Sequence, residues 1–179
     1  AVLPPGENTF DWFEPSFTIV NDEPWAVDAQ VGHMVIFDSL AVGPSNAVQI
    51  YAFSEIADPE QPIWDWDGEA IPTVDVPDDL TAWVDAMPLV GTSTPLTIGG
   101  VDAAYWQLEY DRTADNNGVV LSVLDFVDGT LYVDLDSVLH LWHIPRPDGS
   151  VFLIEQVWEG IEGPPERQAP EFFDNFRFD

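Results

Sequence analysis

The sequence predicts an α+β fold in which a curved antiparallel β-sheet carries a few packed helices. Short segments rich in β-branched and aromatic residues recur along the chain, and Gly, Pro, Asn and Asp separate them, which is typical of antiparallel strands. In two places the apolar residues change to helical spacing. A length of 179 residues without an internal repeat fits one domain, residues 1–179.

The first part of the chain is expected to form strands. Segments 17–20, 34–37 and 48–53 are apolar, with many β-branched and aromatic side chains. The chain then changes character, because residues 58–78 contain four Pro among acidic residues and two Trp. This segment is predicted to be a long loop, and loops of such length are usually functional or mobile.

Residues 77–87 predict a helix, with Asp78 as its N-cap and Pro88 ending it. Four apolar side chains share one side of this helix at helical spacing: Leu80, Trp83, Val84 and Met87. The position of Trp83 among them predicts a core anchor rather than part of a ligand site. A strand is expected to start near Leu96 and to pass through Gly99-Gly100, where paired glycines indicate a bulge or the close approach of another backbone.

The second half of the chain predicts more strands and a terminal helix. The expected strands are 104–110, 119–126, 131–136, 138–144 and 151–158. The last two flank Pro147-Asp148-Gly149 and form the clearest hairpin. Because strand 151–158 is apolar on both faces, a second layer must cover it. Residues 170–176 are predicted to form a short helix that supplies part of that layer.

This order of elements resembles a group of secreted proteins and lipoproteins of high-GC Gram-positive bacteria. The residues that carry the resemblance are Phe13-Glu14-Pro15-Ser16-Phe17-Thr18, Trp25, Asp79-Leu80-Thr81-Ala82-Trp83, Ile98-Gly99-Gly100-Val101 and Phe172 to Phe178. The resemblance implies a curved antiparallel sheet with packed helices, as in PsbP-like and Mog1-like folds. It implies no established activity and no catalytic residues.

The charge of the chain indicates its environment. Thirty-three Asp and Glu against four Lys and Arg give a net charge of −29, which argues against nucleic acid and anionic lipid as partners. With 46% apolar residues and eight Trp, the acids belong to a folded domain rather than to a disordered tail. Self-repulsion at this charge is screened at high ionic strength, so a saline, halophilic habitat is expected. Some carboxylates could instead bind Ca²⁺ or a cationic partner.

The location expected for the protein is extracellular or at the cell surface. The sequence starts at Ala1 without a Met or a basic segment, as a secreted chain does after its signal is removed, and a lipid anchor upstream of Ala1 would fit the same start. No apolar run is long enough to span a bilayer. The absence of Cys excludes disulfides and thiol chemistry.

The stretch most typical of a ligand-binding site lies in the predicted long loop. It contains two aromatic rings beside three acids: Trp64, Asp65, Trp66, Asp67 and Glu69. Aromatic rings stack on sugars while carboxylates bind hydroxyl groups or a cation. The alternative is that the two Trp side chains pin the loop to the sheet and leave the acids in water.

Asp111, Asp115 and Asn117 form a candidate metal site, because oxygen side chains alternate there before a Gly. The spacing matches a Ca²⁺ loop only in part, since the Gly comes too late and no Glu closes the loop. The alternative is an ordinary turn, which uses the same residue types. His140 and His143 are predicted to lie on opposite faces of one strand and hence not to share a metal.

The function expected from these features is that of a non-catalytic binding or interaction domain whose partner is an unknown protein or a glycan. No cofactor is required, and Ca²⁺ is the one cofactor that the acids could hold. Two alternatives remain open. The first is a Ca²⁺-dependent glycan-binding module, and the second is a small glycoside hydrolase that uses two carboxyl groups. No G-x-S-x-G or other nucleophile motif is present.

Overall fold

The computed structural model describes residues 2–13, 15–22, 24–31, 34–39, 47–60, 72–114, 121–126, 129–133, 137–147, 150–158 and 176–178. This part of the chain consists mostly of antiparallel sheets and contains one short helix, α1 (Thr81–Ala86). The predicted antiparallel sheet is confirmed. The expectation of several packed helices is wrong for the described residues, because strands rather than helices supply most of the covering layers.

The central element is an eight-stranded sheet in the order β1-β4-β5-β6-β14-β13-β10-β9. Its strands are β1 (Val2–Leu3), β4 (Trp25–Val31), β5 (Met34–Ser39), β6 (Ala47–Phe53), β14 (Ser150–Trp158), β13 (Ser137–Ile144), β10 (Val101–Tyr110) and β9 (Leu89–Ile98). All neighbouring pairs are antiparallel. The predicted hairpin of β13 and β14 is present, with Ile144 opposite Val151.

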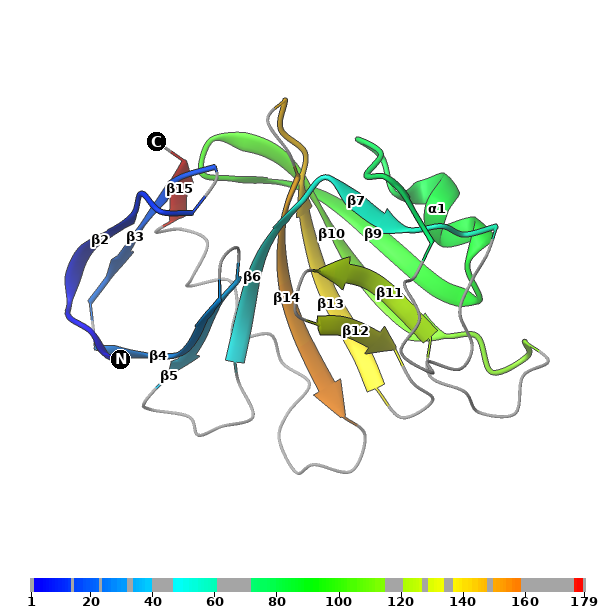
Figure 1. Ribbon diagram of the computed structural model, residues 1–179, viewed down its shortest axis with the longest axis horizontal. Helices are drawn as coiled ribbons and strands as arrows, with labels where there is room; N and C mark the ends of the chain where they lie inside the picture. The colour runs from blue at the N-terminus through cyan, green and yellow to red at the C-terminus, as the bar shows by residue number, and fades with distance from the viewer. Residues whose placement is uncertain are drawn as a thin grey trace.

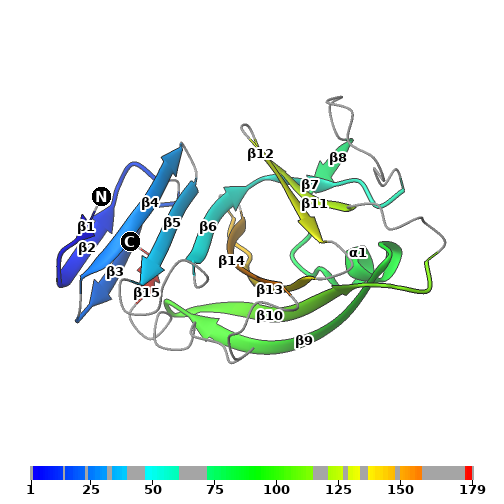
Figure 2. The same cartoon turned by 90° about the horizontal axis from the view of Figure 1, so that it is seen from below.

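Three smaller sheets accompany the central one. They are β15 (Phe176–Phe178) with β3 (Phe17–Asn21) and β2 (Gly6–Phe10), β7 (Glu55–Ala57) with β8 (Thr73–Asp75), and β11 (Leu121–Phe126) with β12 (Gly129–Val133). Figure 1 shows β2, β3 and β15 at one end of the molecule and β7, β11 and α1 at the other, with β6, β14 and β13 between them. In Figure 2 the sheet curves, and β9 and β10 run beneath α1.

The two faces of the central sheet belong to two separate hydrophobic clusters. Along β14, Val151 and Leu153 pack with the aromatic residues of β2 and β3, whereas Phe152 and Ile154 pack with Leu80, Trp83 and Val84 around α1. All four β14 side chains are buried. Side chains alternate between the faces of a strand, so a strand with apolar residues on both faces requires cover on both sides. The predicted second layer is therefore confirmed.

The helix α1 begins later than its sequence suggested. Asp78 is not its cap, because Leu80 occupies the N-cap position and gives no side-chain cap hydrogen bond. Asp79 accepts hydrogen bonds from the backbone N–H of Thr81, at 2.9 Å, and from its hydroxyl, at 2.7 Å. The prediction that Trp83 is a core anchor is confirmed, since only 3% of its surface is exposed.

The glycine pair at 99–100 turns the chain between β9 and β10 instead of lying within a strand. Ile98 pairs with Val101, so the two glycines form a two-residue hairpin loop with φ of +58° and +81°. Strand β9 starts at Leu89 rather than near Leu96, because the residues from Leu89 onwards already pair with β10. The expected close approach of another backbone is confirmed, since Gly99 forms a bridge with Arg177.

Two further expectations are corrected. The segment 58–78 is not entirely a loop, because Thr73–Asp75 form β8 against β7. Phe176, assigned by the sequence to a terminal helix, lies in strand β15 and pairs with Ile19; residues 170–175 lie outside the described residues. The described part of the chain contains no helix that is both long and apolar enough to cross a bilayer.

Candidate functional site

The predicted ligand-binding stretch is carried by a closed two-stranded stem. Strands β7 and β8 pair antiparallel, with Ala57 opposite Thr73. Immediately beyond them, the backbone N–H of Asp58 donates to the carbonyl of Pro72 at 2.8 Å. The Thr73 hydroxyl also donates to the Glu55 carboxylate at 3.1 Å. The chain is thus closed at Asp58 and Pro72, which flank the segment carrying the predicted ligand-binding stretch.

The stem is fixed to the hydrophobic core from one side. Ile56 and Ala57 of β7 are buried in the cluster around α1, with exposures of 0% and 2%. The indole Nε1 of Trp83 donates to the Ala57 carbonyl at 2.8 Å. At the other end of the stem, the N–H of Val76 donates to the Ser54 carbonyl at 3.0 Å. Helix α1 therefore holds the stem against the central sheet.

All five residues predicted for ligand binding lie outside the described residues: Trp64, Asp65, Trp66, Asp67 and Glu69. The structure describes only the stem from which their segment extends. The sequence did not reveal that β7 and β8 pair with each other. Strand β8 is only three residues long and two of its side chains are exposed, so it gives no clear strand pattern.

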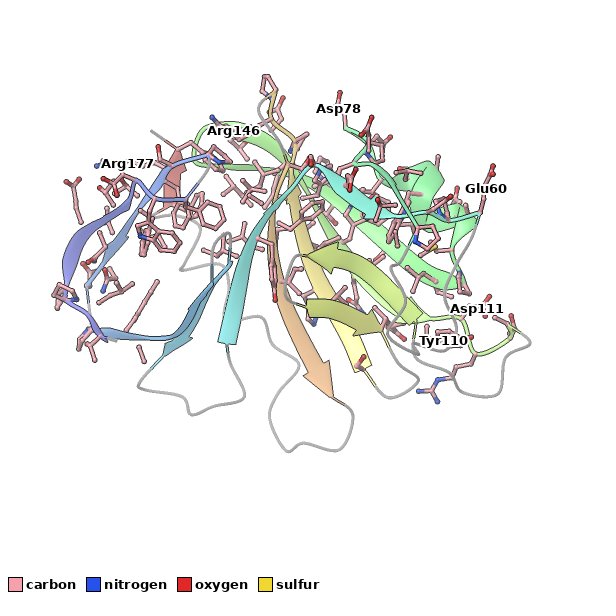
Figure 3. The ribbon with its side chains drawn as sticks, in the orientation of Figure 1. Glu60, Asp78, Tyr110, Asp111, Arg146 and Arg177 are labelled. Atoms are coloured by element: carbon pink, nitrogen blue, oxygen red, sulfur yellow. The ribbon has the colours of Figure 1, made fainter. Side chains whose placement is uncertain are left out.

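Where the structure describes their side chains, the acidic residues lie at the surface. Most are exposed, and Asp58 and Asp111 are half-buried. Figure 3 shows Glu60 and Asp111 at the end of the molecule that carries α1, and Arg177 at the opposite end, beside β15. Such an arrangement suits a solvated acidic surface, because each carboxylate keeps its hydration.

The candidate metal site is described at only one of its three residues. Asp111 accepts hydrogen bonds from the Thr113 backbone N–H at 2.8 Å and from the Thr113 hydroxyl at 2.7 Å. The hydroxyl bond, followed by the backbone bond, lowers the pKa of Asp111. Asp115 and Asn117 lie outside the described residues. Within the described ranges, no three His, Asp or Glu side chains are grouped closely enough to hold a metal ion.

His143 and Ser150 form a buried pair that sequence reasoning missed. The imidazole Nε2 of His143 lies 2.9 Å from the Ser150 Oγ, and the two residues are 1% and 7% exposed. The ring stacks on Phe152 at 4.9 Å. Burial lowers the pKa of His143 to about 4, although the charges of Asp78 and Asp79 oppose this shift.

A hydroxyl beside an imidazole is the arrangement of a serine nucleophile and its base. Here the base is weak, because its pKa lies near 4, and the hydroxyl is almost wholly covered. A catalytic base has a pKa closer to the working pH, and its nucleophile must reach a substrate. The pair is therefore suited to packing the hairpin of β13 and β14 rather than to acyl transfer.

A second buried pair lies on the opposite face of the same strand. The Tyr105 hydroxyl is 2.7 Å from His140 Nδ1, and the two rings stack at 6.0 Å with Trp142 beside them. His140 and His143 project to opposite faces of β13, so the prediction that the two rings lie on opposite faces of one strand is confirmed. Each ring is buried and hydrogen-bonded, His140 to Tyr105 and His143 to Ser150.

The comparisons with protein families and with curated proteins assign no function to this chain. No protein-family model matches it, and no curated protein matches it at a significant level. The resemblance to secreted proteins of high-GC Gram-positive bacteria therefore stays a prediction.

Proposed function

We propose that this chain is a secreted or cell-surface binding domain without catalysis, whose acidic surface is adapted to a saline environment. Its contact surface is the segment between β7 and β8, with Trp64 and Trp66 as aromatic contacts and Asp65, Asp67 and Glu69 beside them. The observation that carries the proposal is the closed stem, in which Asp58 and Pro72 are joined by a backbone hydrogen bond.

A closed stem that is anchored in the core favours binding for an energetic reason. Fixing the two ends of a segment removes part of the conformational entropy that the segment would otherwise lose when it meets a ligand. Here the stem is fixed by the buried Ile56 and Ala57 and by the Trp83 indole. Binding residues are often carried on loops positioned by such a rigid scaffold.

The proposed partner is a glycan or a protein that offers hydroxyl or amide groups. Indole rings provide flat apolar faces, and carboxylates accept hydrogen bonds from sugar hydroxyls. A purely electrostatic partner is less suitable, because the high ionic strength that stabilises an acidic surface also screens attraction between charges.

The two alternatives receive less support from the described residues. A glycoside hydrolase needs a carboxyl group whose pKa is raised, whereas the pKa values of Asp79 and Asp111 are both lowered, mainly by hydrogen bonds from Thr81 and Thr113. For a Ca²⁺-dependent module, Asp111 is the candidate metal ligand that the structure describes. Its Oδ1 already accepts two hydrogen bonds from Thr113, which would compete with a metal ion for this oxygen.

The experiment is a binding screen on a glycan array with the wild-type chain and two variants. The first variant carries Trp64→Ala and Trp66→Ala. The matched control carries Trp12→Ala, which removes an indole that is 44% exposed on the connection between β2 and β3. We expect the double variant to lose at least tenfold in affinity for any glycan bound by the wild type, and the control to retain binding. Equal binding by all three chains would overturn the assignment of the contact surface.

If the wild type binds no glycan, the exposure of its tryptophan rings still tests the proposed contact surface. If Trp64 and Trp66 form a contact surface, acrylamide should quench a larger share of the fluorescence in the wild type than in the double variant. An equal quenched share would show that the two rings are buried, and the proposed surface would then be wrong.

A further inference from the structure

Strand β9 forms one edge of the eight-stranded sheet. All ten of its residues pair with β10, which is its one neighbour among the described strands. Figure 2 shows β9 on the outer side of β10. Four consecutive residues of β9, 92–95, are exposed. An edge strand presents unpaired backbone N–H and C=O groups along its outer side, and these groups can pair with a strand of another chain.

The register of the β9–β10 hairpin decides which backbone groups point outward. Ile98 and Val101 flank a two-residue loop, so they form a hydrogen-bonded pair. Hydrogen-bonded and non-hydrogen-bonded pairs then alternate along the antiparallel ladder. At the other end of the hairpin, the Asp111 N–H donates to the Pro88 carbonyl at 2.9 Å, which fits the same alternation. The backbone groups that point away from β10 therefore belong to Leu89, Gly91, Ser93, Pro95 and Thr97.

This outward row of donors is interrupted at its start and in its middle, and another strand lies beyond its end. The Leu89 N–H donates to the Met87 carbonyl at 2.7 Å. Pro95 has no N–H, and an outward position of an edge strand is where a sheet tolerates proline. Gly99, directly after β9, forms a bridge with Arg177 of β15. Pro95 is therefore the interruption that divides the exposed middle of the edge.

The side chains of β9 do not protect its edge. Natural edge strands often carry a charged residue that opposes pairing with another edge. Leu89–Ile98 contains no charged residue, although 21% of the chain is charged. Its exposed side chains include Val90 and Thr92, and β-branched residues favour strands. The net charge of −29 holds two copies apart at low ionic strength, but salt screens this repulsion.

We propose that Pro95 blocks this edge from pairing with a second copy of the chain. A second copy is the partner that the edge would otherwise accept, because two β9 strands have equal length and bring no charges together. In such a pair the ladder would lack one donor from each strand, and each proline ring would displace the facing carbonyl. Pro95 thus takes the place of the missing charge, and its effect does not depend on ionic strength. This role is independent of the proposed contact surface between β7 and β8.

The test is the mass of the chain in solution, measured by analytical ultracentrifugation in molar NaCl from micromolar to millimolar concentration. Pro95→Thr restores the missing donor, and the matched control is Pro147→Thr, at an exposed position of the β13–β14 loop. We expect the wild type and the control to remain at 19.9 kDa. Pro95→Thr should associate at least about tenfold more tightly than either, because each copy regains a hydrogen-bond donor. Equal masses for the wild type and Pro95→Thr, whether both are monomers or both associate, would overturn the proposal.

Two further measurements locate the association at β9. The double variant Ser93→Pro with Pro95→Thr moves the proline to the next outward position, so it should be a monomer again. In Pro95→Thr, hydrogen exchange of the Ser93 and Thr97 amides should slow as the concentration rises, whereas exchange in β1, at the opposite edge of the sheet, should not change. If the double variant does not fold, the exchange measurement decides. Exchange at Ser93 and Thr97 that is independent of concentration would show that the copies meet elsewhere and would contradict the role of Pro95.

Discussion

Trp83 and Ala57 are joined by a buried hydrogen bond in which the indole Nε1 donates to the backbone carbonyl at 2.8 Å. The two residues are 26 positions apart in sequence, and the bond links helix α1 to strand β7. A single side chain thus connects the hydrophobic core to the stem of the proposed contact surface. The first prediction follows from this bond.

Trp83→Phe should destabilise the protein more than Trp106→Phe. Both indoles are buried, at 3% and 5% exposure, and both substitutions remove a similar ring volume. Trp106 Nε1 has no hydrogen-bond partner in the described part of the chain, whereas Trp83 Nε1 has one. The difference between the two free energies of unfolding should be about 1 to 2 kcal/mol, measured by urea denaturation. Equal losses would mean that the bond to Ala57 contributes nothing.

Gly99→Ala should cost more than Gly100→Ala. Both glycines have positive φ, so both substitutions carry a similar conformational penalty of about 1 to 2 kcal/mol. A Cβ at Gly99 would lie 3.1 Å from the Arg177 Cα and 3.1 Å from the Phe176 carbonyl oxygen, whereas a Cβ at Gly100 meets nothing within 4 Å. We expect faster exchange of the β15 amides in Gly99→Ala alone. Similar exchange in both variants would contradict the close contact.

Phe17→Ala should be far more damaging than Glu7→Gln, although both residues hold the β2–β3–β15 layer. Phe17 is fully buried and stacks on Phe10 at 4.8 Å and on Phe176 at 4.9 Å, so its loss should cost about 3 to 5 kcal/mol. Glu7 pairs with Arg177 at 2.6 Å, but both side chains are more than half exposed. This ion pair should contribute about 0 to 1 kcal/mol. Thermal unfolding of the two variants measures both losses, and comparable losses would contradict this ranking.

The free energy of unfolding should fall as the pH decreases from 6.5 to 4, and His143 should be a main cause. Above pH 6.5 the ring is neutral in both the folded and the unfolded chain, so it contributes no pH dependence. Below that value only the unfolded chain binds the proton, because the pKa of the folded ring lies near 4. The loss at pH 4.5 relative to pH 7 should be about 2.5 kcal/mol larger in the wild type than in His143→Gln. Urea denaturation at the two pH values measures it, and identical losses in both chains would exclude His143 as the cause.

The sequence predicted the strands of the central sheet well where apolar residues occupy both faces of a strand. In β13 and β14 both faces are buried, so the requirement for two covering layers could be derived from the residues alone. The identity of those layers could not, because β2, β7 and β8 are short and carry exposed polar residues. Their pairing depends on contacts between segments far apart in the chain, and local patterns do not contain that information.

The candidate site was predictable only in its residue types. The Trp and acidic residues between 64 and 69 can be recognised in the sequence, but the backbone bond from Asp58 to Pro72 that closes their stem cannot. The same limit applies to His143 and Ser150, which are seven residues apart across a hairpin. Asp78 was assigned as a helix cap because it precedes an apolar stripe, yet Asp79 makes the local hydrogen bonds to Thr81. The N-cap itself is Leu80, and a shift of two residues from Asp78 lies within the usual uncertainty of helix ends.

The central claim is that the acidic residues form a solvated, salt-adapted surface. Thermal unfolding of the metal-stripped protein tests it most directly, in low salt and then with NaCl, MgCl₂ or CaCl₂ at matched ionic strength up to molar salt. We predict that Tm rises with ionic strength to the same extent for all three salts, because screening of a net charge of −29 does not depend on the identity of the cation. A large rise at a few millimolar CaCl₂, absent with MgCl₂ and NaCl, would contradict the claim and would show a Ca²⁺ site coupled to folding.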